Sequence, residues 1–182
     1  EQVLSELLPI ERAAGLPRPI GVVLNYLGRA ILDQGDAART LPLLVESLSI
    51  FDSERADWGI SWTLINLGLA ERALGNWAKS ASYYWRAFQV YRGLDQVGGL
   101  RAACEGLASL AVEIGDFEKS VSLLAAAEKV YRQSGQPLTS YEIKIQQHTF
   151  NRTQAALSEP AWKQACRAGE ILTIEQLIAL IE

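Results

Sequence analysis

The sequence predicts an all-α fold, a solenoid of about three and a half helical-hairpin repeats with a helical cap at its C-terminal end. The first observation is a regular spacing of glycines, because Gly35, Gly75 and Gly115 lie 40 residues apart (75 − 35 = 115 − 75 = 40). The second is that the residues around each glycine recur in register: Asp or Asn follows it, and a large aromatic residue lies further on (Phe51, Tyr91 and Tyr131). The third is an apolar spacing of three and four residues, which indicates helices rather than strands.

The composition fits a soluble globular segment, with 49% hydrophobic and 21% charged residues in a chain of 182. The net charge of −4 comes from interspersed acids and bases, which argues against direct binding of nucleic acid by this segment. No apolar run approaches the roughly 18 residues of a membrane span, so we expect no membrane contact. Since the chain begins Glu1-Gln2-Val3, with neither a signal peptide nor an initiator methionine, we expect a fragment of a longer cytoplasmic protein.

The opening segment is expected to be half a repeat, residues 1–15. Residues 2–14 predict a helix with an apolar stripe at Leu4, Leu7 and Leu8. Shifted by one period, this stripe matches the second helix of the following repeat, so the first helix of the opening repeat is missing. An uncovered apolar stripe tends to find a partner, and self-association through this truncated repeat is therefore expected.

Three full repeats are expected at 19–54, 57–93 and 95–134. Their first helices are predicted at 19–34, 57–74 and 95–114, and their second helices at 36–54, 76–93 and 116–134. Each second helix starts with a good N-cap residue directly after the glycine that ends the first one: Asp36, Asn76 and Asp116.

Small residues at fixed positions predict close packing within each hairpin. Gly28, Gly68 and Ala108 on the first helices face Thr40, Ser80 and Ser120 on the second helices. A larger side chain at either site would force the two helices apart, at a cost of roughly 1–3 kcal/mol.

Residues 135–182 are expected to form the capping helices that cover the last repeat. The pattern predicts a long polar helix at 138–157, a short helix to about Ala168 that Gly169 ends, and a last helix opened by Thr173. Thr173 and Gln176 have the spacing of a capping box.

The residues Leu67-Gly68, Gly75-Asn76-Trp77, Ser80 and Tyr84 resemble the signature of the tetratricopeptide repeat. The resemblance covers residues 1–134 and implies a right-handed α-α superhelix. The period of 40 differs from the usual length of about 34 residues, and the characteristic proline between repeats is absent.

Long-period arrays of this kind are similar to the C-terminal regions of bacterial regulators with a STAND-type ATPase, often joined to a LuxR-type DNA-binding domain. The tail adds to this second resemblance through Ala156-Leu157, Trp162, Ala165, Arg167-Ala168-Gly169-Glu170, Leu172-Thr173 and Glu175. It implies a protein-interaction, sensor or scaffold segment of a transcriptional regulator. No Gly-x-x-x-x-Gly-Lys-Ser/Thr motif occurs here, so no nucleotide cofactor is expected.

Catalytic chemistry finds little support in the sequence. The sole histidine, His148, lies on a polar stretch without a nucleophile motif nearby. Cys104 occupies a core-facing position of its helix, and its spacing from Cys166 suits neither a metal site nor a redox pair. We therefore expect no enzyme, no catalytic or metal-ligating residues and no cofactor.

The resemblance implies instead that the first helices of the repeats line a concave groove for a ligand. The groove contacts expected on this basis are Asn25, Arg29, Trp62, Asn66, Arg72, Glu105 and Glu113. Arg29, Trp62 and Arg72 stand out, because Trp and Arg dominate interface energetics. The expected partner is a protein or peptide, either another domain of the same polypeptide or a separate chain. The alternative is a small-molecule inducer held in the groove around Trp62 and Arg72.

Overall fold

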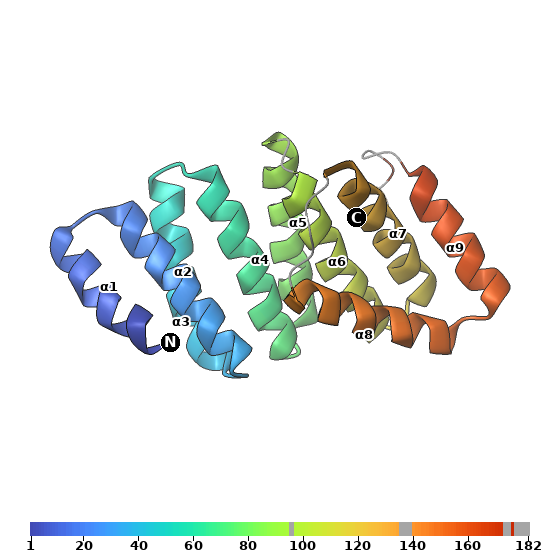
Figure 1. The fold of residues 1–182 in the computed structure, drawn as a ribbon, viewed down its shortest axis with the longest axis horizontal. Coiled ribbons are helices and arrows are strands. Elements are labelled where there is room, and N and C mark those ends of the chain that lie inside the picture. The colour runs from blue at the N-terminus through green and yellow to red at the C-terminus, as the bar shows by residue number, and fades with distance from the viewer. Residues whose placement is uncertain (95–96, 135–139, 173–175, 177–182) are drawn as a thin grey trace. The chain divides into compact units, whose positions relative to one another are not determined.

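The computed structural model describes residues 1–94, 97–134, 140–172 and 176, and these residues form helices joined by short turns, without a strand (Figure 1). The predicted all-α class is therefore confirmed. The helices are α1 (Gln2–Ala14), α2 (Pro17–Asp33), α3 (Ala37–Ser53), α4 (Asp57–Ala73), α5 (Trp77–Gly93), α6 (Val97–Glu113), α7 (Phe117–Ser134), α8 (Ser140–Ala156) and α9 (Glu159–Ile171).

The chain divides into two compact units, Glu1–Val90 and Tyr91–Glu182, with the boundary inside α5. In the first unit helices that follow one another pack together: α1 on α2, α2 on α3 and α3 on α4, while α2 also touches α4. In the second unit α6 packs on α7, α7 on α9, and α8 against both α6 and α7. Packing of consecutive helices is the arrangement expected of an α-solenoid. None of the described helices combines the length and the hydropathy needed to cross a bilayer.

The three hinge glycines adopt the same backbone geometry. Gly35, Gly75 and Gly115 have positive φ angles of 91°, 77° and 83°. The N–H of each donates to the carbonyl three residues earlier, at 2.9, 3.0 and 3.2 Å, and the next residue's N–H donates to the carbonyl five residues earlier, at 3.3, 2.9 and 2.8 Å. These two bonds define a Schellman end. The recurring Gly-Asp/Asn pair therefore produces one local structure at all three hinges.

The residues after the hinge glycines begin the second helix of each pair. The carboxylates of Asp36 and Asp116 each accept the N–H three residues on, both at 3.1 Å, which confirms these two predicted N-caps. Asn76 uses its side chain differently, because its Nδ2 donates to Oε2 of Glu71 at 2.6 Å. The amide thus bonds back to the preceding helix, α4.

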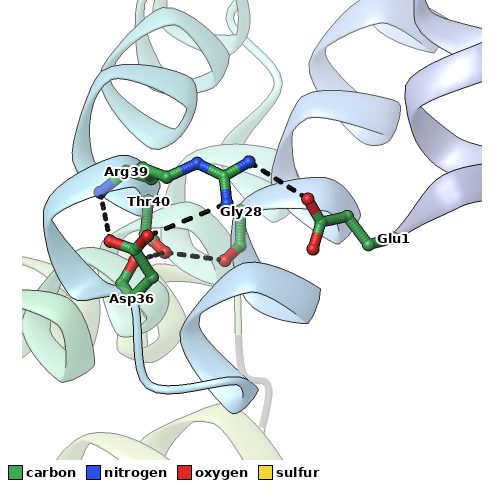
Figure 2. A network of polar contacts seen from close by, with 5 residues as sticks. All are labelled: Glu1, Gly28, Asp36, Arg39 and Thr40. Atoms are coloured by element: carbon green, nitrogen blue, oxygen red, sulfur yellow. Dashed lines mark hydrogen bonds and ion pairs between the residues drawn. The ribbon is translucent and has the colours of Figure 1, made fainter.

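The first hinge also holds the start of the chain. Figure 2 shows the guanidinium of Arg39 between the carboxylates of Asp36 and Glu1, at 3.7 Å and 3.1 Å. The hydroxyl of Thr40 lies 3.0 Å from the carbonyl oxygen of Gly28. One turn of α3 is therefore linked both to α2 and to the residue before α1.

The hydroxyl bond between Thr40 and Gly28 recurs in the later helix pairs. Each small residue of the second helix is fully buried and donates to the carbonyl twelve residues earlier: Thr40 to Gly28, Ser80 to Gly68 at 2.7 Å and Ser120 to Ala108 at 2.8 Å. From the sequence, these residues were predicted to be small only so that the two helices could pack closely. The structure adds a hydrogen bond at each of these positions. Because a buried hydroxyl needs a hydrogen-bond partner, this bond fixes the position of one helix along the axis of the other.

The structure corrects the prediction for the tail. The helix expected to stop before Gly169 continues through it, since α9 extends to Ile171. A Cβ at Gly169 would collide with the carbonyl of Ser122 and approach the Cβ of Ala125 to 2.8 Å. This glycine therefore allows α9 to pack closely on α7, and it does not end the helix. Thr173, predicted to open the last helix, lies outside the described residues.

Candidate functional site

The predicted contact residues fall in both compact units. Asn25, Arg29, Trp62, Asn66 and Arg72 belong to α2 and α4 of the first unit, whereas Glu105 and Glu113 belong to α6 of the second. Within the first unit, the structure brings most of these predicted contact residues together where α2 packs against α4.

Two buried asparagines join α2 to α4. Asn25 and Asn66 are 0% and 1% exposed, and the Nδ2 of Asn66 donates to the Oδ1 of Asn25 at 2.5 Å. The Nδ2 of Asn25 in turn donates to the hydroxyl of Thr63 at 2.5 Å. These amides are therefore occupied inside the fold, and they position neighbouring groups rather than offer contacts of their own.

The inner end of this network is satisfied by backbone carbonyls. The hydroxyl of Thr63 lies 2.8 Å from the carbonyl of Gly59 in its own helix, and that of Ser47 donates to Gly21 at 2.8 Å. The two hydroxyls are 3.3 Å apart. Buried polar groups with partners fix one arrangement of the helices, because any slip leaves them unsatisfied.

The outer end of the network reaches the surface at Arg29. Its Nη1 donates to the Oδ1 of Asn66 at 3.2 Å, and its Nε donates to the carboxylate of Asp33 at 2.9 Å. The side chain of Arg29 remains 26% exposed, and that of Asp33 50%. The guanidinium is therefore held in one orientation while part of it faces solvent.

An aromatic pair lies beside this arginine. Tyr26, 53% exposed, meets Trp62 edge to face, with ring centroids 4.7 Å apart and an interplanar angle of 70°. Tyr26 precedes Arg29 by three residues, so these two side chains lie on the same face of α2, one turn apart. Trp62 precedes Asn66 by four residues, so these two likewise lie on the same face of α4. We call Tyr26, Arg29, Asp33 and Trp62 the α2/α4 site.

Arg72 is separate from the α2/α4 site. It lies ten residues after Trp62 in the same helix, which is roughly 15 Å along the axis. Its side chain is half-buried, and its Nε is buried without a hydrogen-bond partner among the described residues. The structure shows no contact that links it to Trp62.

The two glutamates of α6 are engaged in ion pairs. Glu105 is buried and pairs with Arg101 at 2.7 Å, next to Cys104, whose pKa is raised to about 12 by burial and secondarily by Glu105. Glu113 pairs with Arg152 of α8, also at 2.7 Å. Glu105 thus lies inside the second unit, and Glu113 helps to hold α8 against α6.

Sequence reasoning missed Tyr26 and Thr63. The available signal for Tyr26 was its position three residues before Arg29 in a helix, which places an aromatic next to a cation. For Thr63 the available signal was its distance of 38 residues from Asn25. This distance is close to one repeat period, so the two residues occupy similar positions along the first helices of neighbouring repeats. Helical periodicity alone did not indicate that they meet.

The chemistry available at the α2/α4 site is recognition. The guanidinium of Arg29 is already bound to Asn66 and Asp33, so it supplies a polar group of fixed orientation, and the neighbouring rings offer apolar area with little rotamer freedom to lose. Among the described residues no three His, Cys, Asp or Glu side chains are grouped as metal ligands, and His148 is exposed on α8.

Comparison of the chain with protein-family models found no match. Neither a curated protein nor a solved structure matched it.

Proposed function

We propose that this chain is a tetratricopeptide-like α-solenoid that acts as a protein-interaction, sensor or scaffold segment of a larger cytoplasmic bacterial regulator. In this proposal the α2/α4 site binds a protein or peptide, either another domain of the same polypeptide or a partner. A STAND-type ATPase and a DNA-binding domain would lie elsewhere in the polypeptide. Such a segment acts by holding or releasing the domains beside it.

The repeat architecture is supported by the local geometry of the three hinges. A positive-φ glycine, the same two backbone bonds and the same hydroxyl bond twelve residues apart occur at each of them. Stacked hairpins of this type present an extended surface on which binding residues sit at fixed positions. A right-handed superhelix of 40-residue repeats is the arrangement we propose.

The observation that carries the binding function is the pre-oriented Arg29 beside the exposed Tyr26 and the half-buried Trp62. Trp, Tyr and Arg are enriched among the few residues that carry most of the binding energy at protein interfaces. Because Asn66 and Asp33 already hold the guanidinium, its binding to a partner costs little side-chain entropy. An aromatic or aliphatic side chain of a partner would pack on these rings beside the Arg29–Asp33 ion pair.

Site-specific photo-crosslinking in the full-length polypeptide tests the proposal. A photoreactive phenylalanine derivative replaces Tyr26 in one protein and Trp77 in the control, because Trp77 is an aromatic in the same unit with a 39% exposed side chain. We expect a discrete crosslink, to another domain or to a partner, from position 26 and none of that kind from position 77. No crosslink from position 26, or the same product from both, would contradict the proposal.

Affinity measurements with the captured partner give the energetic test. Tyr26→Ala and Arg29→Ala should each weaken binding by about 1–2 kcal/mol, which corresponds to roughly 5–30-fold in Kd. Trp77→Ala should leave the affinity unchanged.

A further inference from the structure

A cleft in the second unit lies between α7, α8 and α9 and has a volume of about 830 Å³. Both α8 and α9 pack against α7, and each of the three helices supplies part of the lining. The lining residues are Val121, Leu124, Ala125, Glu128, Lys129 and Arg132 from α7, Gln146, Gln147 and Phe150 from α8, and Trp162, Cys166 and Glu170 from α9. We call this the α7–α9 cleft.

The walls of the α7–α9 cleft are held in place by packing. Gly169 lets α9 approach the backbone of α7, and Ser122 on α7 donates to the carbonyl of Ala165 on α9 at 3.1 Å. Phe150 of α8 meets Trp162 of α9 edge to face, with centroids 5.5 Å apart and an interplanar angle of 83°. The cleft is thus present before any ligand arrives, as is usual for small-molecule sites.

The inner surface of the cleft is mostly apolar. Aliphatic side chains of α7 and the two aromatic rings contribute to its apolar part. Cys166 adds to this character, because burial, together with the nearby charge of Glu170, raises the pKa of its thiol and keeps it protonated at neutral pH. Offset or edge-on contact with Phe150 and Trp162 suits a planar aromatic ring.

The charges that line the cleft balance. Lys129 and Arg132 carry two positive charges, and Glu128 and Glu170 carry two negative ones. Arg132 pairs with Glu128 at 3.2 Å, and the Nζ of Lys129 donates to the carbonyl of Leu172 at 3.3 Å. Because these charges of the lining cancel, neither an anion nor a cation gains net electrostatic attraction in the cleft. The free energy needed to remove water from a charged ligand would therefore not be offset.

We propose that the α7–α9 cleft binds an uncharged, largely aromatic small molecule. The volume lies inside the range of roughly 300–1,000 Å³ that holds small ligands. The amides of Gln146 and Gln147 provide donors and acceptors that orient a polar substituent of such a ligand. This cleft is distinct from the α2/α4 site, and the proposal stands whether or not that site binds a protein.

Titration with N-phenyl-1-naphthylamine, an uncharged aromatic whose fluorescence rises in apolar surroundings, tests the proposal on the whole chain. We expect saturable binding of one probe per chain. Cys166→Trp places an indole in the cleft and should raise Kd at least about tenfold. The control Ile114→Trp adds the same group at a 68% exposed position outside the cleft and should leave Kd unchanged.

A second measurement, the rate at which Cys166 is alkylated, uses the wild-type chain and therefore does not depend on whether a variant folds. Cys104 is fully buried and Cys166 half-buried, so at mildly alkaline pH, where part of the Cys166 thiol ionises, N-ethylmaleimide should modify Cys166 rather than Cys104 in the folded chain. Probe at ten times its Kd should slow this reaction about elevenfold by mass action, and the alkylated chain should no longer bind the probe.

The negatively charged analogue 1-anilinonaphthalene-8-sulfonate tests the charge assignment. We expect it to bind more weakly than the uncharged probe, and equal or tighter binding would overturn the inference of an uncharged ligand. Binding of the uncharged probe that does not saturate, that persists in Cys166→Trp, or that leaves alkylation of Cys166 unslowed would overturn the site itself.

Discussion

The close contact between α4 and α5 predicts that Gly68→Ala destabilises the fold. A Cβ on Gly68 would lie 2.6, 2.8 and 2.9 Å from the Cε1, Cδ1 and Cζ atoms of Tyr84. The ring of Tyr84 is fully buried, so it has no open space into which to move. The helices must therefore separate, or the ring must leave its preferred rotamer.

Two opposing effects set the magnitude. Alanine is favoured over glycine inside a helix by about 1 kcal/mol, which would stabilise the variant. Overpacking of a core costs about 1–3 kcal/mol, and three ring atoms closer than 3.0 Å place this site near the upper end. We expect a net loss of about 2 kcal/mol in the free energy of unfolding.

Urea unfolding followed by circular dichroism measures this loss. Gly93→Ala at the end of α5 is the control, because a Cβ there meets none of the described atoms within 4 Å, and it should change the free energy of unfolding by less than about 1 kcal/mol. In a Tyr84→Leu background, Gly68→Ala recreates the Ala108 and Leu124 combination found one period later, and the penalty should largely disappear. A Gly68→Ala variant as stable as wild type, or a penalty that persists in the Tyr84→Leu background, would refute the reasoning.

Three further predictions follow from the contacts and exposures described above. Asn66→Ala removes the amide that joins Asn25 to the α2/α4 site and should lower stability in urea by about 1–3 kcal/mol, so a loss below about 0.5 kcal/mol would contradict the network's structural role. The pKa of Cys104 is raised from 9.0 to about 12 in the folded chain, so the unfolded chain releases this proton first and stability should fall as the pH rises from 9 toward 12. Urea unfolding as a function of pH measures that fall, which should be shallower in Cys104→Ala. The stripe Leu4, Leu7 and Leu8, through which self-association was expected, is half-buried, whereas Val3 and Ile10 of the same helix are 75% and 64% exposed. Self-association through α1 should therefore weaken in a Val3→Asp, Ile10→Asp double variant, and a wild-type chain that stays monomeric in light scattering at high concentration would contradict it.

The local structure was largely predictable because it depends on residues close in sequence. The glycine followed by Asp or Asn predicted each hinge, and the apolar spacing predicted α1 as residues 2–14, which matches Gln2–Ala14. Burial of Cys104 and exposure of His148 also followed from their positions on a helix face. Gly169 was misjudged, because a glycine that ends a helix and one that admits a neighbouring helix look alike in sequence.

The α2/α4 site was predicted only in part. Arg29 and Trp62 were expected to line a concave groove, and the structure places both half-buried on α2 and α4. Asn25 and Asn66 were expected to contact a ligand, but they bond to each other inside the helix pair. Tyr26 was not expected at all. Which side chains meet across two helices depends on their crossing angle and their relative translation, and periodicity contains neither quantity.

The sequence by itself determined most helix boundaries within the repeats, which face of each helix is apolar, and that one hinge structure occurs three times, because these properties depend on backbone preferences and short-range spacing. Only the tertiary structure decided that Asn25 reaches Asn66, that Glu113 holds Arg152, and that α7, α8 and α9 leave a cleft of about 830 Å³. Each of these features joins residues from different helices. The physical reason is that packing fixes the spacing between helices through many weak contacts at once, which no single segment of the chain specifies.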